Sequence, residues 1–187
     1  MRSIKHLANY STGKTLSSDD LIEFHASRLL LLIAVCGSKD QKAKTLKIEG
    51  LTKLAKLDFF IRYPAFFNRV AAYLDSQAAL TDDTIESKMV RFHYGPWDKR
   101  YYQIIPFLEA RGLIRVAKQG SAYNFLLTDL GKNLSEKLTA DQQFSEVTNR
   151  MRTVKEVLGK KTGNQLKELI YKVFDEEVAD KNLNDPI

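Results

Sequence analysis

The sequence predicts a mainly α-helical protein with one small β-ribbon, and three consecutive features predict it. Residues 97–111 carry apolar side chains three or four positions apart, the spacing of a helix with one buried face. Two short apolar runs follow at residues 113–116 and 123–127, and the turn around Gly120 between them indicates a β-hairpin. Another helix is expected at residues 129–138. This order is typical of a winged helix-turn-helix core, in which a recognition helix precedes its wing.

The composition is that of a globular chain large enough for one core and a helical extension. Of the 187 residues, 44% are hydrophobic and 28% are charged, which excludes a chain that is disordered throughout. We expect an N-terminal arm at residues 1–18, a winged-helix-like domain at residues 19–138 and a C-terminal helical extension at residues 139–187. The formal net charge of +6 is compatible with a nucleic-acid partner without requiring one.

The single cysteine and the lack of long apolar runs indicate the cytoplasm. Cys36 has no second cysteine with which to form a disulfide within the chain, and its apolar neighbours predict a buried thiol. The sequence has no N-terminal signal pattern, and no apolar run approaches the roughly 18 residues that a membrane span needs. We therefore expect a cytoplasmic protein that does not enter a membrane.

The first third of the chain is expected to be helical. Residues 21–36 are apolar nearly all round and predict a helix at the centre of the core, followed by a charged surface loop at residues 37–42. In residues 50–63 the apolar positions share one side of a helix, and the basic positions lie away from it in solvent. Pro64 should end that helix, and a further helix is expected at residues 64–76.

The segment before the recognition helix alternates apolar and polar residues. Residues 89–94 therefore predict a short strand that can join the wing as its third strand, with Arg91 beside the start of the recognition helix. Pro106 is inconsistent with a regular helix that begins at residue 97, because proline has no N–H to donate. We expect either a kink near Tyr102 or a later start of the helix.

The C-terminal part predicts two more helices and a linker. The helices are expected at residues 141–158 and 164–178, and the glycine-flanked basic residues 159–163 predict the linker. The last helix is amphipathic. Its apolar side can fold back on the core or dock on another subunit, and the sequence leaves both open.

Three features imitate chemical sites but lack the residues that such sites need. Residues 11–15 resemble the end of a phosphate-binding P-loop, but Ala8 stands where that loop needs a glycine. Residues 86–88 have the Glu-x-Lys form of some metal-dependent nucleases, without a partner aspartate on a neighbouring strand. His25 has no second ligand nearby and predicts a hydrogen-bonded structural side chain. We therefore expect no catalytic residues, no metal and no cofactor.

An uneven charge distribution gives the candidate nucleic-acid contacts. Residues 88–118 hold seven basic and two acidic residues, a balance of +5, whereas residues 175–187 have a balance of −4. A basic recognition helix and wing would suit DNA phosphates, but side chains that commonly read base edges are missing, so weak sequence preference is expected. The candidates are Arg91, Lys99, Arg100, Arg115 and Lys118.

A second set of residues is the candidate partner interface. It joins the basic side of the helix at residues 50–63 to aromatic residues, for which core packing is the first interpretation and an interface the alternative. Its members are Lys53, Lys56, Phe59, Arg62, Trp97 and Tyr101.

Two blocks of the sequence carry a resemblance to a known family. The first is residues 50–64 (GLTKLAKLDFFIRYP), and the second joins residues 94–102 (YGPWDKRYY) to residues 108–114 (LEARGLI). Together they resemble the middle component of the bacterial ABC-three-component systems, which include Lamassu-type defence operons, and the similarity covers residues 21–138. A weaker likeness exists to the antitoxin-type Panacea domain, which also joins a Lys-Leu-rich helix to a Tyr-Gly-Pro turn.

The resemblance implies a function in defence against phages and plasmids. It implies a non-catalytic winged-helix subunit that binds an SMC-like ATPase and helps to hold an effector, often a nuclease, inactive until foreign DNA is sensed. Contact with double-stranded DNA, without strong sequence preference, is a further expectation. The alternative is a free-standing winged-helix DNA-binding regulator or an antitoxin-like protein. An enzyme is the third class considered, and the residues supply no convincing site for one.

Overall fold

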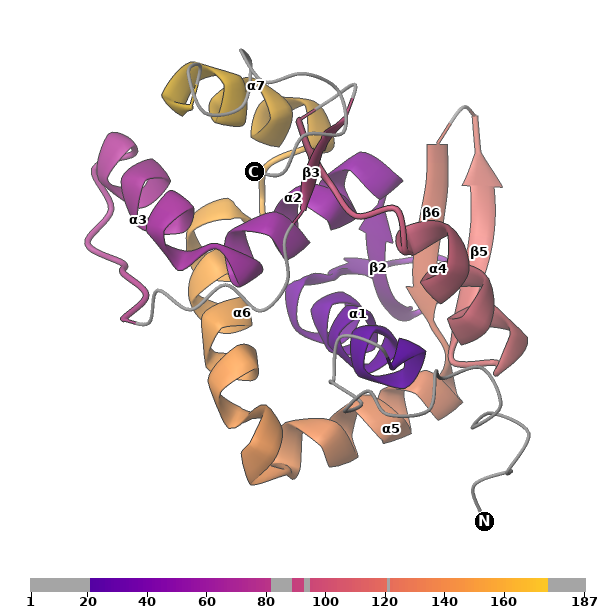
Figure 1. Ribbon diagram of the computed structural model, residues 1–187. Coiled ribbons are helices and arrows are strands. Elements are labelled where there is room, and N and C mark those ends of the chain that lie inside the picture. Colours follow the sequence, from indigo (N-terminus) through magenta and orange to yellow (C-terminus); the bar gives the residue numbers. More distant parts are fainter. Residues whose placement is uncertain (1–20, 82–88, 93–94, 121, 175–187) are drawn as a thin grey trace, which may run out of the picture.

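A computed structural model describes residues 21–81, 89–92, 95–120 and 122–174, with the side chains of residues 91 and 92 left out. Figure 1 shows helices arranged around α1, with a small sheet along one side. The elements in chain order are α1 (Ile22–Cys36), β1 (Ser38–Asp40), β2 (Thr45–Glu49), α2 (Leu51–Arg62), α3 (Pro64–Tyr73), β3 (Val90–Phe92), β4 (Gly95–Trp97), α4 (Tyr101–Ala110), β5 (Ile114–Gln119), β6 (Ala122–Leu127), α5 (Asp129–Ala140), the 3-10 turn η3 (Gln142–Phe144), α6 (Ser145–Leu158) and α7 (Gly163–Val173). The fold is therefore mainly α-helical with a small antiparallel sheet, as the sequence predicts.

Helix α1 lies at the centre of the core. Its residues 29–33 are each at most 1% exposed, because they are apolar on every side of the helix and neighbours cover every side. The elements that contact α1 are α2, α4, α5, α6, β2 and β6. The thiol of Cys36, at the end of α1, is buried as predicted, and burial raises its pKa to about 12.

Four antiparallel strands form the main sheet in the order β1-β2-β6-β5. The predicted hairpin is confirmed: β5 pairs with β6 from Ile114 opposite Leu127 to Gln119 opposite Ala122. Strand β2 pairs with the other side of β6, and Ile48 lies opposite Phe125. Ile48, Phe125 and Leu127 are buried on the face that packs against the helices.

The predicted surface loop at residues 37–42 is wrong in part, because residues 38–40 are strand β1. This strand pairs with β2, whose Leu46 and Ile48 are more shielded than the exposed Glu49 at the strand's end. The Lys47 amino group lies 2.9 Å from the Asp40 carboxylate and so joins the two strands electrostatically. The charged composition of residues 37–42 thus gave no indication of the short edge strand β1.

The predicted third strand of the wing is also wrong. Strand β3 pairs only with β4 among the described residues, in a separate two-stranded sheet where Val90 lies opposite Trp97. The neighbour of the hairpin is β2 instead. Trp97, expected in the recognition helix, is the last residue of β4. Residues 93 and 94, which the prediction also covered, lie outside the described residues.

The helix boundaries follow the proline and glycine signals. Helix α2 ends at Arg62, two residues before Pro64, and α3 starts at that proline. Helix α4 begins at Tyr101, which confirms the expected later start, and continues through Pro106. It ends before Gly112, whose φ of 66° suits the turn in which the Leu113 N–H donates to the Leu108 carbonyl at 3.0 Å.

The last two helices fold back on the same core. Buried residues of α6 and α7 belong to the same apolar cluster as those of α1 and α2. Figure 1 shows α7 beside α2 and α3, and it contacts both. The predicted linker is a short turn, and Thr162 and Gln165 form a capping box at the start of α7. Of the alternatives for this helix, packing on the core is the one observed; residues 175–178 of the predicted helix lie outside the described residues.

Candidate functional site

A buried carboxylate joins α1, α2 and α4. Asp58, on α2, is fully buried and accepts hydrogen bonds from Arg28 Nε at 2.9 Å and Tyr101 Oη at 2.7 Å. The Arg62 guanidinium lies 3.3 Å from the same carboxylate, one helical turn along α2. Arg28, Arg62 and Tyr101 are at most 3% exposed. The side chain of Asp58 therefore connects three helices from inside the core.

A second carboxylate extends the network into a ring. Asp98, in the turn between β4 and α4, accepts from Arg62 Nη1 at 2.8 Å and Arg100 Nε at 2.9 Å. Nitrogens of Arg100 and Arg28 lie 2.7 Å and 3.0 Å from the two ring nitrogens of His25. His25 is 2% exposed, which confirms the prediction of a structural histidine held by polar contacts. The ring fixes the start of α4 relative to α1 and α2.

The guanidinium groups keep both carboxylates ionised. Burial alone would raise the pKa of Asp58, but the positive charges of Arg28 and Arg62 outweigh it and lower that pKa. Burial also opposes the charge of Asp98, and hydrogen bonds from Arg100 together with the charge of Arg62 hold its pKa well below the ordinary value. A carboxylate saturated in this way is a poor proton acceptor at neutral pH. The network is suited to holding helices in place.

A buried lysine lies next to this network. Lys56 has no exposed side-chain area, and its Nζ donates to the Pro96 carbonyl at 2.8 Å and lies 5.9 Å from the centre of the Trp97 ring. Burial and the nearby charge of Lys167 lower the pKa of Lys56 to about 7. Lys56 thus ties α2 to β4 at the cost of desolvating an amine.

Five members of the candidate partner interface lie in the core. Core packing, the first interpretation of Phe59, Trp97 and Tyr101, is therefore confirmed, and the interface is wrong for all five. Their side chains have from 0% to 6% of their area exposed, so they cannot contact a partner in this conformation. These residues are Lys56, Phe59, Arg62, Trp97 and Tyr101. The prediction that the basic side of α2 is solvated fails for Lys56 and Arg62, since each finds buried acceptors. Lys53 is half-buried and donates to the Gly159 carbonyl at 2.8 Å.

The candidate nucleic-acid residues do not form one patch. Lys99, Arg115 and Lys118 are exposed. Arg115 and Lys118 are three residues apart on β5, and because side chains alternate along a strand they stand on opposite faces. Arg100 is 27% exposed and is bound to Asp98. The side chain of Arg91 lies outside the described residues.

The exposed side of α4 carries no positive charge. Between Tyr101 and Ala110 the helix contains neither lysine nor arginine. Tyr102 is 61% exposed, and Pro106, one turn later, is exposed as well. Because Pro106 has no N–H, the Tyr102 carbonyl lacks its usual helical donor. Glu109 accepts from the Val116 N–H at 2.9 Å and so ties α4 to the edge strand β5. A basic recognition helix, as expected from the charge count, is therefore not what the structure has.

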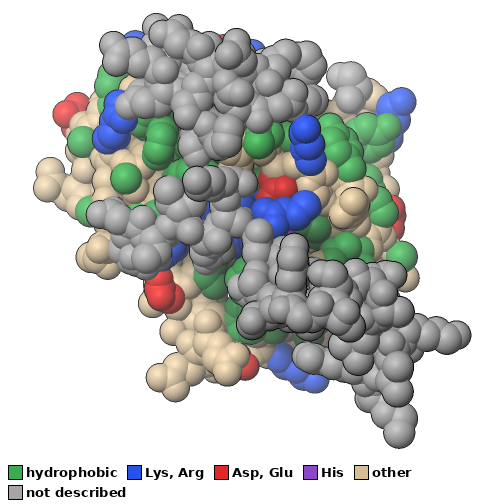
Figure 2. All heavy atoms as spheres, viewed as in Figure 1, with side chains coloured by type: hydrophobic (Ala, Val, Ile, Leu, Met, Phe, Trp, Pro, Cys, Tyr) green, Lys and Arg blue, Asp and Glu red, His purple; other side chains and the backbone are tan. Residues whose placement is uncertain are grey.

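The upper part of the hairpin continues this exposed surface. Lys118 and Tyr123 lie opposite each other across β5 and β6, on the face that also carries Val116 and buried Phe125. Both extend beyond the core, and Tyr123 is 50% exposed. We call Lys99, Tyr102, Pro106, Lys118 and Tyr123 together the α4–hairpin surface. On the side of Figure 2 where α4 and the hairpin lie, hydrophobic and basic side chains reach the surface together.

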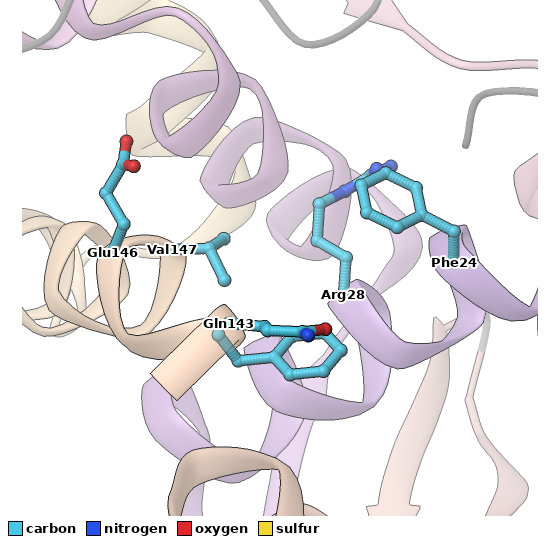
Figure 3. Close-up of a pocket in the computed structure, with 6 residues that line it drawn as sticks. Phe24, Arg28, Gln143, Glu146 and Val147 are labelled. Carbon is cyan, nitrogen blue, oxygen red and sulfur yellow. The ribbon is translucent and has the colours of Figure 1, made fainter. Parts of the chain in front are cut away.

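A cavity of about 220 Å³ lies between α1 and the η3–α6 segment (Figure 3). Phe24, Phe144 and Val147 supply apolar walls. Its charged groups already have partners: Arg28 contacts Asp58, and Glu146 pairs with Arg150 one turn along α6. In Figure 3 the Glu146 carboxylate points away from Arg28. The walls therefore present no matched acid and base, and the described residues contain no group of three or more His, Cys, Asp or Glu arranged to hold a metal ion.

Sequence reasoning missed the ionic ring. Two features of the sequence could have pointed to it: Arg28 lies in a mainly apolar helix, and Asp58 and Arg62 are four residues apart. Neither signal reveals Asp98, which is 36 residues from Arg62. Only folding brings that pair together.

Comparisons of the chain with protein-family models, with curated proteins and with solved structures give no match. Within the described part of the chain, none of the helices combines the length and the apolar character needed to cross a membrane. The geometry above and the resemblance of the two sequence blocks are therefore the basis for a functional proposal.

Proposed function

We propose that this chain is a non-catalytic winged-helix accessory subunit of a cytoplasmic defence complex, where it joins an SMC-like ATPase to an effector nuclease. The order of the elements supports the winged-helix assignment. Apart from α3, β3 and β4, which are inserted between α2 and α4, the main path is α1, β1, β2, α2, α4, β5 and β6. In the sheet, β6 lies between β2 and β5, and this order supports taking the hairpin as the wing and α4 as the recognition helix.

The observation that carries the docking function is the exposed side of α4, which presents an aromatic ring and no positive charge. A helix that binds DNA through its backbone needs positive charge to neutralise phosphates. Here the exposed positions include Tyr102 and Pro106, and the one charged side chain within the helix is Glu109. Aromatic side chains are enriched where proteins contact each other. The surface is therefore better suited to a protein than to DNA.

The buried ring supports a positional mechanism. The ring orients α4 and the wing by fixing Tyr101 and Asp98 to α1 and α2. In the proposed mechanism the ATPase binds this rigid body, the effector is held inactive beside it, and movement of the ATPase on sensing foreign DNA frees the effector. The subunit contributes geometry and no chemistry.

Co-purification tests the proposal. The chain would be expressed with the SMC-like ATPase and the effector that the proposal expects beside it in its operon, and the complex measured by size-exclusion chromatography with light scattering. We expect one stable assembly, and no nuclease or ATPase activity from the isolated chain. Failure to bind the ATPase rejects the assignment. An activity of the isolated chain that is lost in Lys14→Ala or Glu86→Gln rejects the non-catalytic part.

A regulator or antitoxin-like protein is the second candidate, and the exposed cations Lys99, Arg115 and Lys118 favour contact with DNA. Binding to the chain's own promoter and to random duplex would be compared at two salt concentrations. Under the adaptor proposal we expect weak binding that salt abolishes and that does not distinguish the sequences. A strong preference for the promoter supports the regulator instead.

A further inference from the structure

The α4–hairpin surface combines exposed aromatic rings with flanking positive charge. Tyr102 and Tyr123 are 61% and 50% exposed, on the helix and on the hairpin respectively. Lys99 precedes α4 directly, and Lys118 stands opposite Tyr123. Figure 1 shows α4 and the hairpin next to each other, and α4 contacts β5. The two rings thus stand on adjoining elements, which the Val116–Glu109 hydrogen bond joins.

Negative charge on this surface is already engaged. Glu109 is the only carboxylate of α4, and its Oε1 accepts from the Val116 N–H. Arg111, directly after the helix, stacks on Phe107 with its guanidinium carbon 3.5 Å from the ring centre. Among the described residues of this surface, the exposed charges left for a partner are those of Lys99 and Lys118.

We propose that the α4–hairpin surface is the docking site for a protein segment that presents an apolar helical face flanked by Asp and Glu residues. This inference rests on the proposed adaptor function and adds to it the surface used and the chemistry of the partner. The apolar face covers Tyr102, Pro106 and Tyr123, and the acidic residues meet Lys99 and Lys118. Burial of the rings supplies the affinity, and the lysines set the orientation and the salt dependence.

Charge complementarity selects this occupant over DNA. A duplex would place phosphates along the length of α4, where there is no cation between Tyr101 and Ala110. An acidic amphipathic helix places its charges at the rim and apolar side chains over the rings.

Photo-crosslinking tests the site directly. p-Benzoylphenylalanine would replace Tyr102 in the full chain, co-expressed with the ATPase and effector, and the crosslinked peptide would be sequenced by mass spectrometry. The matched control carries the same residue at Tyr73, which is 47% exposed on α3. We expect a crosslink from position 102, absent from position 73, to a segment with apolar spacing of three and four and an excess of Asp and Glu. A crosslink to DNA, to a basic segment or to nothing overturns the inference.

Substitutions separate this inference from the function on which it rests. Tyr102→Ala with Tyr123→Ala should weaken ATPase binding by about tenfold or more, and Lys99→Glu with Lys118→Glu should weaken it most at low salt. Tyr73→Ala should change affinity less than about twofold. A complex that forms normally in both double variants overturns the docking site and leaves the adaptor function standing. If the ATPase does not bind, but position 102 crosslinks to an acidic amphipathic segment of the effector, the docking site stands and the adaptor assignment fails.

Discussion

The Tyr101 hydroxyl donates to the Asp58 carboxylate at 2.7 Å across 43 residues of sequence, and both side chains are fully buried. Tyr101 is the first residue of α4, and Asp58 lies in the second half of α2. Burial together with the negative charge of Asp58 raises the pKa of Tyr101, so the hydroxyl keeps the proton that it donates. This contact fixes the exposed side of α4, on which the proposed docking depends.

Asp58→Asn is expected to destabilise the fold by about 3 to 5 kcal/mol, because it removes the charge that compensates Arg28 and Arg62 in the core. Urea unfolding followed by circular dichroism measures the change. Glu136→Gln is the control, since Glu136 and Lys132 form a pair on the surface at 4.0 Å, and about 0.5 kcal/mol or less is expected. Equal effects of the two substitutions would show that the ring does not stabilise the fold.

Acid should unfold the protein partly through Asp98. Burial opposes its ionisation, but Arg100 and Arg62 lower its folded-state pKa well below the ordinary 3.8. Its ion pairs therefore stabilise the fold above the unfolded-state pKa, and this stabilisation is lost as pH falls from there toward the folded-state pKa. The unfolding free energy of the wild type should fall more steeply below about pH 4 than that of Asp98→Asn. Parallel curves from urea titrations at a series of acidic pH values would contradict this.

Lys56 should also make stability rise with pH, but over a higher range of pH. Its pKa is about 7 in the fold, against 10.5 as the ordinary value, so between these values the unfolded chain binds more protons. Stability therefore rises with pH across this range, and the cost of burying the ammonium is complete below about pH 7. Lys56→Met lacks this term. The difference in unfolding free energy between this variant and the wild type should therefore favour the variant more at about pH 6 than at about pH 9. The change in that difference should be on the order of 3 kcal/mol. Melting temperatures of both proteins at the two pH values test this, and a constant difference would refute it.

The sequence predicts helices and the hairpin well because their signals are local. The apolar run of α1, the proline at residue 64 and the glycine at residue 112 each mark an element or its end within a few residues. Strand β1 was missed because three residues with two charges give no periodic signal. The pairing of β2 with β6 also depends on contacts far apart in sequence.

The candidate site was less predictable, because charged residues are usually exposed and two of those in this site are buried. Lys56 and Arg62 were placed in solvent on the basis of their charge. Their acceptors, the Pro96 carbonyl and the Asp98 carboxylate, are 40 and 36 residues away. A lysine or arginine is buried when the fold supplies such a partner, and a single sequence does not show which distant residue will supply it.

Two glycines at the base of the β5–β6 hairpin should respond differently to alanine. A Cβ on Gly131 would lie 1.9 Å from the Leu113 carbonyl oxygen, which also accepts from the Thr128 backbone N–H at 3.2 Å, so backbone must move. At Gly112 a Cβ meets nothing within 4 Å, and only the positive φ opposes alanine. We expect Gly131→Ala to cost about 3 kcal/mol or more and Gly112→Ala about 1 kcal/mol. Urea unfolding of both variants measures this order. If Gly112→Ala were the more damaging, the close approach of Gly131 to the Leu113 carbonyl would not be the tighter constraint on the base of the hairpin.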